Sequence, residues 1–122
     1  MNGTDVFSFG ITQVPRELKS FIKQLSKEVS DIDYFLFHQA NKFMLEMIRK
    51  KLKLESSQVP YSIIKYGNTS SASIPLTLSI LGDGVRNKKI AMCGFGVGLS
   101  IGCGYFEIGN LFVNEIIEYE GY

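Results

Sequence analysis

The stretch between residues 89 and 107 restricts the possible folds more than any other part of this 122-residue chain. Apolar or aromatic residues alternate there with glycine, and the glycines of one parity are Gly94, Gly96, Gly98, Gly102 and Gly104. A period of two indicates β-strands, because successive side chains point to opposite faces. The pattern therefore predicts two strands with one face nearly free of side chains, which a backbone or a ligand can approach closely. Glycines at residues 96–98 would allow the positive φ angles of a tight connection.

A short apolar run earlier in the chain predicts a buried parallel strand. Residues 34–37 read Tyr-Phe-Leu-Phe, which is continuous and short, as expected of a strand covered on both faces. Apolar residues at three- and four-residue spacing predict a helix before this strand and a second helix from about Asn41 to Lys53. Asn41 has a side chain suited to an N-cap. Together these elements indicate an α/β fold.

The remaining segments give weaker patterns. The alternation at residues 6–9 is compatible with a short strand, and Pro15 would then lie in the first turn of the first helix, whose apolar stripe continues to Leu25 and Val29. A third helix is expected to end at Leu81, before glycine-rich residues 82–84. Residues 55–66 read as irregular, and residues 110–122 show no pattern that places them.

Composition and charge exclude several classes of function. With 13 Lys and Arg against 12 Asp and Glu, the net charge is +1, so nothing favours nucleic acid or an anionic membrane as a partner. No apolar stretch reaches the roughly 20 residues of a membrane-spanning helix, and we expect a cytoplasmic protein. Cys93 and Cys103 lie ten residues apart in the predicted strand pair, with no second ligand type nearby. We predict small core residues there, and neither a metal site nor a disulfide.

His38 is the single histidine, and it follows the predicted strand at residues 34–37. Open α/β sheets place functional groups at this position, beyond the carboxyl end of a strand. Position alone leaves a structural, hydrogen-bonded histidine equally open.

Three motifs that follow one another along the chain favour a functional role for His38 over a structural one. They are His-Gln-Ala-Asn at 38–41, Tyr-Gly-Asn-Thr-Ser-Ser-Ala-Ser-Ile-Pro at 66–75 and Gly-Phe-Gly-Val-Gly-Leu-Ser at 94–100. In this order they resemble the β-ketoacyl-acyl carrier protein synthase III family, over about residues 1–106. The resemblance implies one half of a thiolase-like fold, with helices layered on a mixed five-stranded sheet. Residues 1–122 would then be the C-terminal catalytic domain, and the absent N-terminal half would carry the nucleophilic cysteine.

The resemblance also implies roles for particular residues. His38 and Asn68 would be catalytic, donating hydrogen bonds to the thioester carbonyl of a malonyl group while carbon dioxide leaves. The backbone of Gly96 and Val97 would supply a second oxyanion hole, and Phe95 would lie beside the substrate. Val97 stands where the family usually has a glycine, so the space for the acyl chain can differ here.

The implied partners are an acyl carrier protein, acyl-coenzyme A and a second copy in a homodimer. Asn41 matches an asparagine that contacts the pantetheine arm of thioester substrates, and no separate cofactor is implied. The family often has an arginine two positions further for docking the acidic carrier protein, where this chain has Phe43, so the chain departs from the family pattern at this contact. Two alternatives remain: a stand-alone, non-catalytic binding or assembly module, and a related acyltransferase that forms esters or amides.

Overall fold

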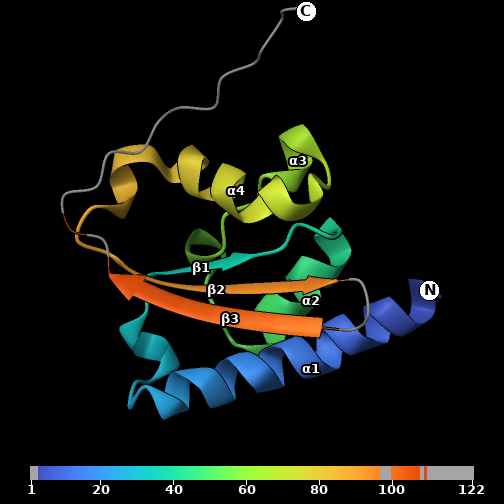
Figure 1. Cartoon of the computed structure of the whole chain (residues 1–122), viewed down its shortest axis with the longest axis horizontal. Helices are drawn as coiled ribbons and strands as arrows, with labels where there is room; N and C mark the ends of the chain where they lie inside the picture. The colour runs from blue at the N-terminus through green and yellow to red at the C-terminus, as the bar shows by residue number, and fades with distance from the viewer. Residues whose placement is uncertain (1–2, 97–99, 108, 110–122) are drawn as a thin grey trace, which may run out of the picture.

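The computed structural model describes residues 3–96, 100–107 and 109, and it has a sheet between two layers of helices (Figure 1). The sheet has three strands in the order β1-β2-β3. β1 (Tyr34–Phe37) is parallel to β2 (Lys89–Gly96), and β2 is antiparallel to β3 (Ser100–Glu107). A mixed sheet is therefore confirmed, whereas five strands are wrong for the described residues, which contain three.

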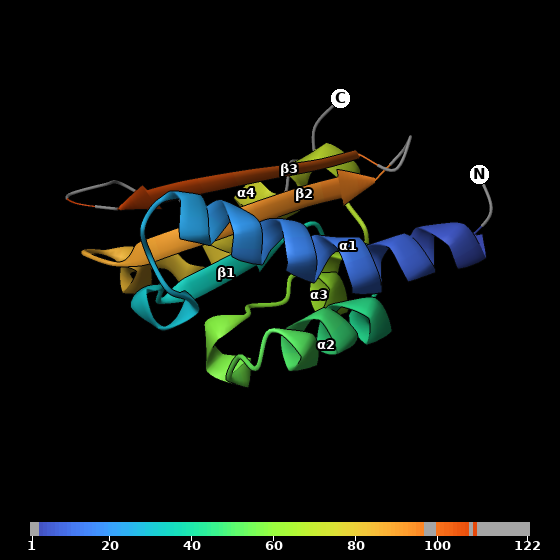
Figure 2. The same ribbon diagram turned by 90° about the horizontal axis from the view of Figure 1, so that it is seen from below.

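The helices lie on both faces of this sheet (Figures 1 and 2). The α-helices are α1 (Gly3–Gln24), α2 (Lys42–Lys51), α3 (Ile63–Tyr66) and α4 (Ser73–Leu81). Short 3₁₀ turns join them: η1 (Val29–Asp31), η2 (Ser56–Gln58), η3 (Ser70–Ala72) and η4 (Gly82–Val85). The helix predicted to end at Leu81 is confirmed, and the segment at residues 55–66, read as irregular, contains a short helix.

The N-terminal prediction of a strand is wrong. Residues 6–9 lie inside α1, and Pro15 lies in the middle of this helix rather than in its first turn. The reason is packing, because Val14, Leu18 and Ile22 share one buried stripe and extend the helical period upstream. Burial of this stripe outweighs the one intrahelical hydrogen bond that a proline removes. Leu25, which we expected on the stripe, follows the end of the helix and is exposed.

Each face of the sheet buries its own set of side chains. Phe35, Phe37, Ala91 and Cys93 point to the side of α1 and α2 and belong to a large apolar core. The alternate residues Leu36 and Ile90 point to the side of α4 and form a smaller cluster with Val85. This alternation follows the period of two along β1 and β2.

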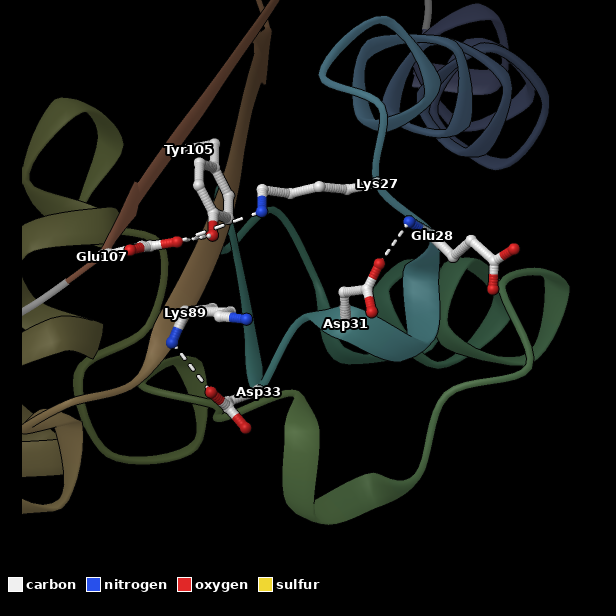
Figure 3. Close-up of polar contacts among 7 residues, drawn as sticks. All are labelled: Lys27, Glu28, Asp31, Asp33, Lys89, Tyr105 and Glu107. Carbon is white, nitrogen blue, oxygen red and sulfur yellow. Dashed lines mark hydrogen bonds and ion pairs between the residues drawn. The ribbon is translucent and has the colours of Figure 1, made fainter.

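The amino end of β1 is a polar, exposed edge (Figure 3). The backbone N–H of Lys89 donates to the Asp33 carboxylate at 2.8 Å, which fixes the start of the β1–β2 pairing. On the neighbouring strand, the Tyr105 hydroxyl donates to Glu107, and the Lys27 ammonium lies over the Tyr105 ring. A concave site forms instead at the opposite edge of the sheet, at the carboxyl ends of β1 and β2.

Of the helices in the described ranges, none combines the length with the hydropathy that crossing a bilayer requires.

Candidate functional site

His38 is placed by the strand that precedes it. Its backbone N–H donates to the Cys93 carbonyl at 3.0 Å, which extends the β1–β2 pairing by one residue. The alternation along β1 then directs the imidazole to the same face as Leu36, where α4 lies. There Nδ1 lies 3.0 Å from the Ser73 hydroxyl oxygen, and the ring contacts the edge of Phe95 with centroids 5.4 Å apart. The predicted position beyond the strand end is confirmed.

A cavity of about 340 Å³ opens beside this imidazole. Its walls come from the end of β1, the start of α4 and the end of β2, and the lining residues are His38, Ser70, Ser71, Ser73, Ile74, Gly94, Phe95 and Gly96. A Cβ atom on Gly94 would lie 3.9 Å from the Ile74 side chain, and one on Gly96 would meet nothing within 4 Å. The glycines that alternate along β2 therefore border the cavity and leave it open to a ligand.

The surroundings of His38 favour the neutral form of its imidazole. Burial lowers the pKa of His38 below its ordinary value of 6.5, and a hydrogen bond with the backbone of Ser70 opposes this shift in part. A neutral imidazole has one N–H donor and one acceptor nitrogen. At neutral pH the ring can therefore donate a hydrogen bond into the cavity without carrying a full charge.

The loop before α4 holds Asn68 in a defined orientation. Gly67 ends α3 with a φ of 68°, a conformation that glycine adopts at least cost. The Asn68 side-chain oxygen then accepts from the Ser70 backbone N–H at 2.9 Å, which leaves the amide N–H groups as its outward donors. Ser70 itself has a φ of 55°, unusual for a residue with a side chain. Asn68 is exposed and is not among the residues that line the cavity.

The structure therefore groups some of the predicted site residues and not others. His38, Phe95 and Gly96 line one cavity. Asn68 precedes the cavity-lining Ser70 by two residues. The predicted oxyanion donor at residue 97 lies outside the described residues.

Asn41 lies at the start of α2, and the prediction that it caps this helix is confirmed. Its side-chain oxygen accepts from the Met44 backbone N–H at 2.7 Å, so its amide N–H groups remain as donors. Asn41 is exposed and does not line the cavity. Two positions further, Phe43 is 65% exposed and stacks on Phe7, with ring centroids 5.7 Å apart. An aromatic pair thus stands where the family often has an arginine.

Sequence reasoning missed two buried polar residues near His38. Ser73 is 2% exposed and contacts the His38 ring. Gln39, the residue after His38, is fully buried. The Gln39 amide donates to the Phe37 carbonyl and accepts from the backbone N–H groups of Ser62 and Ile63. For Gln39 the available signal was a polar residue shortly after an apolar strand, since such a residue must find partners when it is buried.

The two cysteines offer no nucleophile in this cavity. Cys93 and Cys103 face each other across β2 and β3, with sulfur atoms 3.7 Å apart. The contact with Cys103 and burial raise the pKa of the Cys93 thiol, whereas the contact with Cys93 lowers the pKa of the Cys103 thiol. Neither cysteine is among the residues that line the cavity. The prediction that Cys93 is a buried core residue is confirmed. In the described part of the chain, no three His, Cys, Asp or Glu side chains gather as a metal site would require.

Comparison with known families identifies a match over most of the chain. The family described as 3-oxoacyl-[acyl-carrier-protein (ACP)] synthase III C terminal matches residues 22–108. A β-ketoacyl-[acyl-carrier-protein] synthase III from Streptococcus gordonii is 42% identical over 109 residues, which cover 84% of this chain and 33% of that protein. The chain thus spans about a third of the length of the curated relatives it matches.

Solved structures of similar proteins agree. A 3-oxoacyl-(acyl-carrier protein) synthase from Burkholderia xenovorans superposes with a TM-score of 0.88 and 38% identity, over 95% of this chain and 34% of that one. A β-ketoacyl-[acyl carrier protein] synthase III from Thermus thermophilus gives a TM-score of 0.85 and 31% identity, over 91% of this chain and 36% of that one. Both are similar to this chain across nearly all of its length.

Proposed function

We infer the function of this chain from its family, because it belongs to the C-terminal domain family of 3-oxoacyl-[acyl-carrier-protein] synthase III. The thiolase-like α/β architecture expected from the sequence is that of its structural relatives. We propose that residues 1–122 are the C-terminal catalytic domain of a condensing acyltransferase. An N-terminal half would supply the nucleophilic cysteine, and the chain alone would not turn over.

The proposed reaction is a decarboxylative Claisen condensation. His38 and Asn68 would donate hydrogen bonds to the thioester carbonyl oxygen of a malonyl group. As the bond to the carboxylate breaks, its electron pair forms an enolate and carbon dioxide leaves. The enolate carbon then attacks an acyl group on the cysteine of the N-terminal half, and the cysteine thiolate departs. Removing one such oxyanion donor lowers the rate by about 100- to 1,000-fold in well-studied enzymes.

The remaining site residues fit supporting roles in this proposal. The backbone N–H groups of Gly96 and Val97 would bind the acyl-cysteine carbonyl, and Phe95 would flank the substrate. Asn41 would contact the pantetheine arm through the amide N–H groups that capping leaves available. The substrates would be acyl-coenzyme A and malonyl-acyl carrier protein, with no separate cofactor. A homodimer in the cytoplasm completes the proposal.

The observation that carries this proposal is the state of His38. A neutral imidazole lies beside a cavity bordered by glycine, with its Nδ1 bound by Ser73. This state suits an oxyanion donor, because a neutral N–H group can stabilise developing charge through a hydrogen bond without transferring a full proton. Asn68 adds a second donor of the same type, since its oxygen is engaged by Ser70 and its N–H groups are not.

The test compares His38→Gln and Asn68→Ala in the protein as its gene encodes it. Release of carbon dioxide from malonyl-acyl carrier protein should fall at least 100-fold in each variant. Gln24→Ala, at the end of α1, is the control and should retain the parent rate. An unchanged rate in either folded variant would contradict the roles given to these residues.

The same assay separates the alternatives. Acyl transfer to an alcohol or amine without carbon dioxide release would indicate an ester- or amide-forming enzyme. Binding of pantetheine thioesters with no turnover by the complete protein would indicate a binding module.

A further inference from the structure

The buried polar side chains of the described residues form one connected network. They are Gln39, Ser62, Ser73 and Thr77. These residues come from the end of β1, the residue before α3 and the helix α4, so three separate segments contribute. A buried polar group is costly unless it is hydrogen-bonded, and a chain of such groups is retained where its geometry serves a purpose. This network ends on the His38 ring.

Gln39 anchors the network to the strand. Its amide nitrogen donates to the Phe37 carbonyl at 2.9 Å, within its own turn. Its oxygen accepts from the backbone N–H groups of Ser62 at 3.0 Å and Ile63 at 3.1 Å. The first turn of α3 is thereby fixed to the residue that follows His38.

Thr77 sets the direction of the next hydrogen bonds. Its hydroxyl oxygen lies 2.7 Å from the Ser73 carbonyl oxygen and 2.8 Å from the Ser62 hydroxyl oxygen. A hydroxyl has one proton, and a carbonyl can only accept. The Thr77 proton therefore goes to the Ser73 carbonyl, and the Ser62 hydroxyl donates to Thr77.

Ser73 completes the connection to His38. Its backbone is held by Thr77, and its hydroxyl oxygen lies 3.0 Å from Nδ1 of the imidazole. Ser73 is 2% exposed, so its hydroxyl proton needs an acceptor close by, and the His38 ring lies within hydrogen-bond distance. The lone pair of an unprotonated Nδ1 is such an acceptor.

We propose that Ser73, held in place by Thr77, Ser62 and Gln39, donates to Nδ1 of His38 and so keeps the imidazole proton on Nε2. Ser73 is then a positioning residue, which acts through His38. This inference rests on the proposed function in one respect: Nε2–H is the donor that an enolate oxygen would need. Nδ1 is turned to Ser73, and Nε2 is the ring nitrogen that does not face this hydroxyl.

The competing arrangement has the proton on Nδ1. There it would be donated to Ser73, or to the backbone of Ser70, which also hydrogen-bonds to the ring. In that state the Ser73 hydroxyl proton would lose its acceptor on His38, and an unprotonated Nε2 would repel an oxyanion. The two arrangements differ in which nitrogen carries the proton, which can be measured directly.

The measurement is the ¹⁵N chemical shift of both ring nitrogens, in the protein as its gene encodes it, labelled at histidine. The His38 signals are assigned by their loss in His38→Gln. At a pH where the ring is neutral, we expect Nε2 to show the shift of a protonated nitrogen and Nδ1 that of an unprotonated one. A protonated Nδ1 in the unmodified protein would overturn the proposal, and this result needs no further variant.

Variants test whether Ser73 determines which nitrogen of His38 carries the proton. Ser73→Ala should move the Nδ1 shift toward that of a protonated nitrogen, and Thr77→Val should do so to a smaller extent. Thr12→Val is the matched control, because Thr12 makes the same hydroxyl bond to a carbonyl four residues earlier, at 2.6 Å on the exposed side of α1. It should leave the His38 shifts unchanged. A folded Ser73→Ala protein with unchanged ring shifts would contradict the positioning role.

Failure of this inference differs from failure of the proposed function. Protonated Nε2 in a protein that releases no carbon dioxide from malonyl thioesters would reject the reaction and retain the positioning. Decarboxylation in a protein whose Nδ1 is protonated would retain the reaction and reject the positioning role of Ser73.

Discussion

The two faces of the sheet are built from different kinds of side chain, although the same strands supply both. On the side of α1 and α2, Phe35 and Phe37 enter a large apolar core. On the side of α4, Leu36 contributes to a small apolar cluster, and next to it lie the buried hydroxyls of Ser73 and Thr77.

The difference shows that alternate residues of one strand have different structural roles. Because side chains alternate, residues 35 and 37 stabilise the sheet while residues 36 and 38 face the helix that holds the site. The apolar face can tolerate exchange among hydrophobic side chains of similar volume, whereas the polar face depends on each hydrogen bond being made. Each prediction below tests one side of this contrast.

The largest effect is expected on the apolar face. Phe35 is fully buried, and Phe35→Ala should lower the free energy of unfolding by about 3–5 kcal/mol, since it removes buried area and leaves a cavity. Urea denaturation followed by circular dichroism measures the change. Leu78→Ala, in the half-buried layer of α4, should cost about 1–2 kcal/mol because less apolar area is lost. Equal losses at both positions would refute the contrast.

The next effect is expected from the buried polar network that includes Gln39. Gln39→Leu keeps a similar volume but leaves the buried Ser62 N–H without its acceptor, and we expect a loss of about 2–3 kcal/mol in the same assay. The matched control is Gln58→Leu. The Gln58 amide also bonds two backbone groups: its nitrogen donates to the Ile32 carbonyl, and its oxygen accepts from the Glu55 N–H. Water can replace these bonds because Gln58 is partly exposed. A loss of less than about 1 kcal/mol is expected there. Equal losses would show that burial of the amide is not decisive.

Sequence reasoning was most successful where the signal was local and periodic. The strand at residues 34–37, the glycine-alternating strand pair and the cap at Asn41 each depend on neighbours within a few positions, and all three are confirmed. The N-terminal strand was wrong because four residues of alternation are also compatible with a helix. Only the buried stripe through Val14 and Leu18 decides between them.

The site was predictable in part for the same reason. His38 and Phe95 belong to short motifs and were identified, and the structure places both at one cavity. Ser73 lies in one of those motifs too, but its contact with His38 spans 35 positions in the sequence. No local pattern indicates which serine of residues 70–73 faces the histidine. That choice depends on how η3 and α4 pack against the end of β1.

The smallest effect is a change of stability with pH. Burial lowers the pKa of His38 in the folded protein below 6.5, the value expected in the unfolded chain. Below that pH the unfolded state therefore binds more protons than the folded state, and the free energy of unfolding falls. The stabilisation by neutral His38 is complete above pH 6.5 and is lost as pH falls toward the folded pKa.

Comparison with His38→Gln isolates this contribution. Glu46, whose pKa is held below its ordinary value by a hydrogen bond from Arg49, titrates in both proteins and cancels in the difference. Denaturation curves between pH 7 and pH 5 should thus show a steeper decline for the unmodified protein than for the variant. Parallel curves would mean that the folded protein accepts a charged imidazole at no cost. In that case the polar face around His38 would be as adaptable as the apolar face, and the contrast between them would fail at the residue that matters most for the chemistry.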